Sequence, residues 1–138
     1  MGGGAMSIDG EAKSILIVED DFFVAAMMAS IVQQAGFDVM GPTASVSEAL
    51  GLIAGGPPDL ALLDLMLAHG ERSYPVAAEL AARKIPFVFV TGESAQDLSR
   101  IYADVPVCPK PPDPRNIIGQ INSLLGISDR AAAPTGHG

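Results

Sequence analysis

The chain has 138 residues, 49% of them apolar, which is enough for one domain with a substantial hydrophobic core. Its net charge of −8 has the wrong sign for holding nucleic-acid phosphates, and the sequence has neither a basic run nor zinc-ligand spacing. No uncharged apolar stretch reaches the roughly 18 residues of a membrane span, and the first residues lack the basic and apolar regions of a signal peptide. We therefore expect a cytoplasmic protein that neither inserts into membranes nor binds nucleic acid.

The ends of the chain differ in composition from its middle. Residues 1–11 include a Gly-Gly-Gly run, and residues 127–138 are mostly small and polar, so we expect a flexible leader and a flexible tail around one domain at residues 12–126. The single cysteine, Cys108, has no partner for an internal disulfide, which fits a reducing compartment. Its position in a short apolar run predicts a buried, unreactive thiol.

Short apolar runs alternate with helical patterns along residues 12–126. In chain order, they predict a strand at 15–18, a helix over 24–35, a strand at 37–40, a helix over 46–54, a strand at 60–63, a helix over 75–83, a strand at 85–90, a helix within 95–103, a strand at 105–108 and a helix over 114–125. Gly41-Pro42 is expected to close the second strand. Helix N-caps are expected at Asp21, at Ser45 with Glu48 as a capping box, and at Asp113 before Pro114.

This alternation is typical of βαβ units around a parallel sheet. The strands are continuous apolar runs, as expected when helices cover both faces of the sheet. Right-handed crossovers then favour a (βα)5 flavodoxin-like, doubly wound α/β fold with strand order 2-1-3-4-5. The pattern over 95–103 is weak, so the fourth helix is expected to be short or unstable.

Polar side chains stand at the carboxyl ends of four predicted strands. They are Glu19 and Asp20 after the first, Asp64 after the third, Thr91 after the fourth and Lys110 after the fifth. Strands one and three are neighbours in the predicted order, roughly 4.8 Å apart, so the three carboxylates are expected to converge where ligands bind in such sheets. Close carboxylates require either raised pKa values or a hard cation with oxygen ligands, and Mg²⁺ suits this inventory.

Four segments in this order resemble the receiver domains of two-component signalling: Ile-Leu-Ile-Val-Glu-Asp-Asp, Leu-Ala-Leu-Leu-Asp-Leu, Phe-Val-Phe-Val-Thr-Gly and Pro-Lys-Pro. The resemblance implies a single-domain response regulator that takes a phosphoryl group from a histidine kinase or phosphotransfer protein, with Mg²⁺ as cofactor, and that is not a conventional enzyme. The implied roles are Asp64 as phosphoacceptor, Asp20 as direct metal ligand, Glu19 as an acid acting largely through metal-bound water, the Met66 backbone carbonyl as a further ligand, Thr91 as switch hydroxyl and Lys110 as phosphate contact.

Three features depart from the usual receiver pattern. Val107 stands where an aromatic residue usually changes rotamer, the segment between Thr91 and Lys110 is short, and residues 67–75 replace the usual proline-containing loop after Asp64. Together with Pro-Phe-Val-Phe-Val-Thr-Gly, they resemble alphaproteobacterial stand-alone receivers with a Phe-Ala-Thr-Gly motif, although Val90 replaces the alanine. That subgroup implies kinases of the HWE or a related type.

Other functions remain open at this point. A phosphatase with an aspartyl nucleophile is disfavoured by Met66, which stands where such enzymes place a second aspartate. A flavin or nucleotide site is disfavoured by acids where a phosphate cradle is needed. The main alternative is a degenerate receiver that binds partners without phosphorylation.

Three further expectations concern single segments. For a phosphorylation switch, residues 93–112 are the expected surface for contact with the kinase and the target. His69 is expected to be solvated, and Met27 and Met28 are expected to fill the core.

Overall fold

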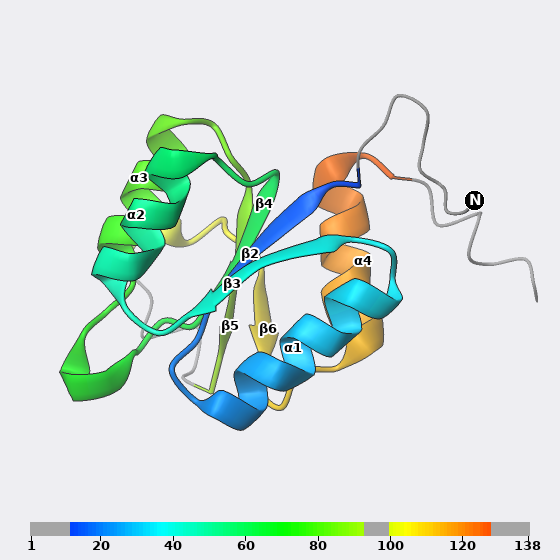
Figure 1. Cartoon of the computed structure of the whole chain (residues 1–138), viewed down its shortest axis with the longest axis horizontal. Helices are drawn as coiled ribbons and strands as arrows, with labels where there is room; N and C mark the ends of the chain where they lie inside the picture. The colour runs from blue at the N-terminus through cyan, green and yellow to red at the C-terminus, as the bar shows by residue number, and fades with distance from the viewer. Residues whose placement is uncertain (1–11, 93–99, 128–138) are drawn as a thin grey trace, which may run out of the picture.

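The structure is a computed structural model of the chain that describes residues 12–92 and 100–127 (Figure 1). Its centre is a parallel sheet of five strands in the order β3-β2-β4-β5-β6, which confirms the predicted order 2-1-3-4-5. The strands are β2 (Ser14–Val18), β3 (Asp38–Thr43), β4 (Leu60–Leu63), β5 (Phe87–Thr91) and β6 (Val107–Pro109). The last two strands begin two residues later than predicted.

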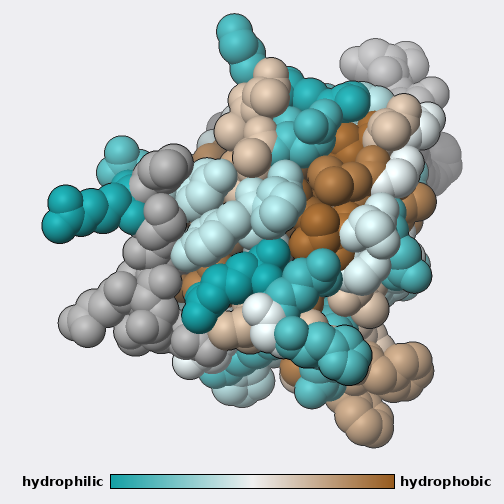
Figure 2. Space-filling model, turned by 90° about the vertical axis from the view of Figure 1, so that its left-hand side faces the viewer, coloured by the Kyte–Doolittle hydropathy of each residue, from teal (hydrophilic) through white to brown (hydrophobic). Residues whose placement is uncertain are grey.

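Four α-helices cover the two faces of this sheet. They are α1 (Phe22–Gln34), α2 (Val46–Gly55), α3 (Tyr74–Ala82) and α4 (Pro114–Leu125). Helices α1 and α4 lie on one face and α2 and α3 on the other (Figure 1). On the side of α2 and α3, an apolar patch is exposed between hydrophilic side chains (Figure 2). The expected fourth helix falls partly on residues 95–99, outside the described residues, and Arg100–Tyr102 form a 3-10 turn, η3.

The core consists of two apolar layers that share the strands. Alternate side chains of a strand point to opposite faces, so Leu16 and Val18 pack toward α2 and α3, whereas Ile15 and Ile17 pack toward α1 and α4. Every residue of β4 and β5 is buried, as expected for the predicted apolar runs. Cys108 is also buried, and burial raises the pKa of its thiol, with Asp113 adding to the effect.

The predicted helix starts are confirmed in most details. The Asp21 side chain accepts hydrogen bonds from the Phe23 and Val24 N–H groups, and Asp113 accepts one from Arg115 N–H. Ser45 Oγ accepts from Glu48 N–H, but the Glu48 carboxylate does not complete a capping box with Ser45. It accepts instead from the Thr43 hydroxyl at 2.7 Å and from Ala44 N–H at 3.2 Å, which lowers the pKa of Glu48.

Two further expectations were wrong. Gly41-Pro42 does not close the second strand, because β3 continues to Thr43 through a register shift in which Val18 pairs with Thr43. Gly41 has φ +92°, and a Cβ there would lie 2.9 Å from Thr43 N and 3.1 Å from Ile17 O, so glycine permits this irregularity. Met27 does not fill the core with Met28: Met28 is buried, but Met27 is 40% exposed on α1.

Candidate functional site

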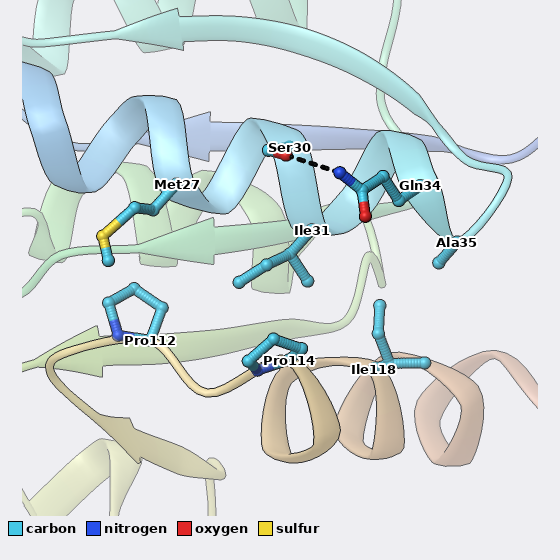
Figure 3. A pocket seen from close by; sticks show the side chains of 8 residues that line it. All are labelled: Met27, Ser30, Ile31, Gln34, Ala35, Pro112, Pro114 and Ile118. Atoms are coloured by element: carbon cyan, nitrogen blue, oxygen red, sulfur yellow. Dashed lines mark hydrogen bonds between the residues drawn. The ribbon is translucent and has the colours of Figure 1, made fainter.

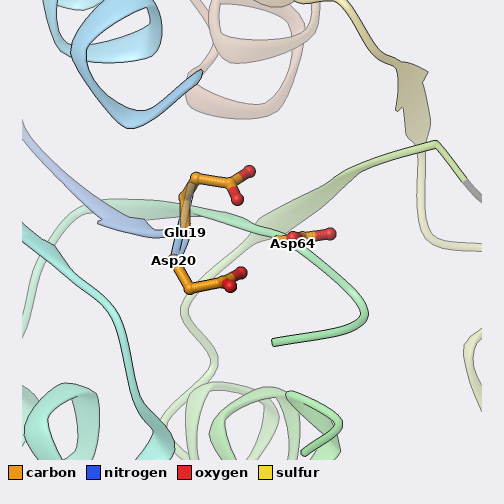
Figure 4. A group of neighbouring side chains, drawn as sticks. All are labelled: Glu19, Asp20 and Asp64. Carbon is orange, nitrogen blue, oxygen red and sulfur yellow. The ribbon is translucent and has the colours of Figure 1, made fainter. Parts of the chain in front are cut away.

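The site lies where β2 and β4 end side by side. Val18 pairs with Leu63, and Asp64 N–H donates to Val18 O at 2.9 Å, so Glu19 and Asp64 leave the sheet together. One carboxylate oxygen from each of Glu19, Asp20 and Asp64 lies within 4.8 Å of the others (Figure 4). The structure thus brings together the three acids that the sequence placed at one edge of the sheet.

Lys110, the residue after β6, reaches this acidic group with its side chain. Its Nζ lies 2.8 Å from Glu19 Oε1 and donates a hydrogen bond to Asp64 Oδ2 at 3.0 Å. Lys110 N–H donates to Thr91 O at 3.2 Å, which joins the ends of β5 and β6. The buried Thr91 is therefore held at the same edge of the sheet as the acids and the lysine.

Burial dominates the electrostatics of Glu19. Glu19 is 2% exposed, and desolvation raises its pKa to about 7, although Lys110 and the Asp21 N–H lower the pKa and Asp64 raises it. Burial alone would lower the pKa of Lys110, but hydrogen bonds with Glu19 and Asp64 raise it, so its ammonium stays charged at neutral pH. One cation therefore faces three carboxylates, two of them buried.

These residues fit a hard divalent cation. The donors are carboxylate oxygens, which Mg²⁺ prefers, and their separation allows them to contact one ion directly or through water. The buried Oε1 of Glu19 lies 2.8 Å from the Lys110 ammonium, which is a single positive charge shared with Asp64, so a divalent cation would offset the charge that remains on the acids. Asp20 is exposed and leaves a route from solvent.

The loop after Asp64 is a short hairpin. Ser73 N–H donates to Leu65 O at 3.0 Å, Leu67 N–H donates to Glu71 O at 2.6 Å, and Met66 pairs with Arg72 between these bonds. Met66 therefore forms a non-hydrogen-bonded pair with Arg72, so its own carbonyl points away from the Arg72 side of the hairpin. His69 lies at the tip with φ 61°. Its side chain is exposed, as expected.

Sequence reasoning missed an exposed aromatic pair beside the acids. Phe22 and Phe23 open α1, are 78% and 76% exposed, and meet edge to face with ring centroids 5.8 Å apart. Phe22 lines a hollow of about 340 Å³ with Glu19 and Asp20. Both residues come just before the helix predicted over 24–35, and two adjacent phenylalanines directly after the acids were the available signal.

A groove of about 590 Å³ separates α1 from α4. Met27 and Ile31 on α1 face Pro112, Pro114 and Ile118 across it (Figure 3). Phe23, Met27 and Ile31 are spaced four residues apart and therefore share one side of α1. Exposed apolar surface thus continues from the acidic site along α1 into this groove.

Comparison with known proteins agrees with this arrangement. Residues 15–120 match the family described as response regulator receiver domain. The chain belongs to this family. Receiver domains are signalling domains, and this one has their CheY-like fold. Within the described residues, none of the helices has the length and apolar character needed to cross a membrane.

Individual receivers show how far the likeness extends. SdrG from Sphingomonas melonis Fr1 is 38% identical, with 83% of this chain and 97% of SdrG covered and a TM-score of 0.74. The PhyR receiver domain of Erythrobacter litoralis, at 22% identity and TM-score 0.76 over 86% of this chain and 93% of that one, is similar in fold. The transcriptional regulatory protein PdtaR of Mycobacterium tuberculosis is 28% identical over 87 residues, which are 62% of this chain and 42% of PdtaR. The match thus spans less than half of that curated relative.

Proposed function

We propose that this receiver domain accepts a phosphoryl group on Asp64 and transmits the change by protein contact or phosphoryl relay. The observation that carries the proposal is the convergence of Asp64 with two further acids and the Lys110 ammonium at one edge of the sheet. An Asp64 oxygen attacks the donor phosphorus, the bond from phosphorus to the donor breaks, and an acyl phosphate forms. Lys110 then offsets charge on the transferred oxygens, and the Thr91 hydroxyl donates to them.

The proposed cofactor is Mg²⁺, held by Asp20, Asp64 and the Met66 carbonyl, with Glu19 acting largely through metal-bound water. When bound, the ion neutralises charge on the phosphoryl oxygens. The hairpin supports the role of Met66, because its carbonyl is directed away from the paired strand. The raised pKa of Glu19 supports its role, because a nearby cation would stabilise the ionised form of a buried carboxyl group whose pKa is about 7.

The proposed phosphodonor is a histidine kinase, of the HWE type, or a phosphotransfer protein. Its histidine must reach Asp64, so its surface must cover the exposed apolar residues that surround the acids. Phe22 and Phe23 are the most exposed of the large hydrophobic side chains that the structure describes, and Phe22 lines the hollow that also contains Asp20. The proposed output surface is 93–112, of which residues 93–99 fall outside the described part of the chain.

The test is uptake of a phosphoryl group from a small-molecule donor. Incubation with acetyl phosphate and Mg²⁺ is expected to add the mass of one phosphoryl group, and a chelator such as EDTA is expected to prevent this gain. SdrG has been solved in a BeF3-activated conformation, so beryllofluoride with Mg²⁺ is expected to shift the amide NMR spectrum around the site. A protein that gains no mass and shows no such shifts would instead be a receiver that acts without phosphorylation.

The donor-binding role of the aromatic pair has a selective test. The double variant Phe22→Ala/Phe23→Ala is expected to lose about tenfold or more in transfer from a protein donor, because exposed aromatics at an interface centre carry much of the binding energy. Uptake from acetyl phosphate is expected to stay unchanged, because neither ring is part of the acidic group. Leu52→Ala, which removes a 37% exposed side chain on α2, is the control. Equal losses with both donors would contradict a docking role.

A further inference from the structure

The hairpin after Asp64 is attached to a helix that lies elsewhere in the sequence. The Glu71 carboxylate accepts a hydrogen bond from the N–H of Val46, the first residue of α2, at 3.2 Å. This N–H has no partner inside its own helix, so Glu71 satisfies one of the unpaired donors of the helix start. The bond connects residues 25 positions apart and fixes the hairpin relative to α2.

The start of α2 is also connected to the backbone of Glu19. Glu48, in the first turn of α2, accepts a hydrogen bond from the Thr43 hydroxyl at 2.7 Å. The Thr43 carbonyl in turn accepts the N–H of Glu19 at 2.8 Å. The start of α2 therefore links the backbone at Glu19 to the hairpin that carries Met66.

We propose that Glu71 is a positioning residue for the cation site, an inference that rests on the proposed function. The Glu71 backbone oxygen accepts a hydrogen bond from Leu67 N–H, which closes the hairpin. The Glu71 carboxylate accepts one from Val46 N–H, which attaches the hairpin to α2. Met66 lies between these fixed points, and its carbonyl keeps its direction relative to Asp64 only while the hairpin is held. Glu71 acts through this geometry and does not touch the ion.

Variants on both sides of the bond separate positioning from general stability. Glu71→Ala is expected to weaken Mg²⁺ binding, measured by calorimetry, by about tenfold, as for other residues that orient metal ligands. Glu71→Gln is expected to stay within about twofold of the wild type, because the amide oxygen still accepts from Val46 N–H. Glu79→Ala removes a carboxylate on α3 that is paired with Arg83, the residue after the helix, and serves as the control.

Val46 offers an independent pair of variants. Val46→Pro removes the N–H, yet proline suits the first helical position, and the preceding Ser45, at φ −139° and ψ 160°, has a conformation that allows it. Val46→Ala loses similar packing but keeps the N–H. We expect Val46→Pro to weaken Mg²⁺ binding like Glu71→Ala, and Val46→Ala to bind like the wild type.

Two failures are distinguishable. If the wild-type protein binds no Mg²⁺ and gains no phosphoryl group, the proposed function is wrong. If the wild type binds Mg²⁺ and folded Glu71→Ala or Val46→Pro binds it equally well, Glu71 merely caps a helix and the inference is overturned. Should Glu71→Ala fail to fold, the comparison of Val46→Pro with Val46→Ala decides the matter.

Discussion

Replacement of Asp64 by asparagine is expected to abolish phosphoryl uptake and leave the fold intact. Asp64 is 3% exposed, so an isosteric side chain is needed, and the asparagine oxygen can still accept the hydrogen bond from Lys110 Nζ. An amide cannot form the acyl phosphate, so mass spectrometry after incubation with acetyl phosphate and Mg²⁺ should show no gain. The loss of one anionic ligand should also weaken Mg²⁺ binding.

The same variant has electrostatic and thermal consequences. Because the Asp64 charge contributes to the raised pKa of Glu19, Asp64→Asn should lower that pKa from about 7, which can be followed by NMR titration of the metal-free protein. Mg²⁺ at a hundred times its dissociation constant stabilises a fold by about 2.7 kcal/mol, so the wild type should melt higher with Mg²⁺, and the variant should gain much less.

Asp38→Asn is the matched control for Asp64→Asn. Asp38 is an exposed aspartate at the first residue of β3, at the opposite end of the strand from Thr43 and the site. It should take up phosphoryl and bind Mg²⁺ like the wild type. Phosphoryl uptake that persists in folded Asp64→Asn would place the acceptor on another residue and contradict the proposed function.

The sequence predicted the sheet because its strongest signals are local and agree with the tertiary structure. Buried runs such as Leu60–Leu63 end abruptly at polar residues, and right-handed crossovers leave few strand orders. The acids and Lys110 could be placed for the same reason, since carboxyl ends of parallel strands meet at one edge. Their roles in phosphoryl transfer follow from chemistry and resemblance and stay predictions.

The errors arose where tertiary contacts decide between local alternatives. Gly41-Pro42 reads as a strand end, but pairing between β2 and β3 carries the strand through a register shift to Thr43. Met27 and Met28 are both apolar, yet neighbours on a helix point about 100° apart, so only one of them faces the core. The hydrogen bond that Val46 N–H donates to the Glu71 carboxylate joins a distant helix start to a loop, and no periodicity in the sequence indicates it.

Removal of the Lys110 charge is expected to change metal binding and phosphoryl transfer in opposite directions. In Lys110→Met, phosphoryl uptake from acetyl phosphate should slow by about a hundredfold, because a charged donor to the transferring oxygens is lost. Mg²⁺ should bind more tightly, by about tenfold, because the ammonium at 2.8 Å from Glu19 and 3.0 Å from Asp64 competes for the same oxygens. Methionine keeps most of the aliphatic stem and its packing.

The pH of the Lys110→Met measurement matters because Lys110 lowers the pKa of Glu19, which is about 7 in the intact site. Without the lysine that pKa rises, so protons compete with Mg²⁺ near neutrality, and binding should be measured well above the pKa of Glu19 found by titration of the metal-free variant. Lys13→Met, at an exposed lysine just before β2, should change neither quantity. If folded Lys110→Met bound Mg²⁺ more weakly, Lys110 would be needed to hold the acids in place; if it took up phosphoryl at the wild-type rate, Lys110 would not contact the phosphoryl group.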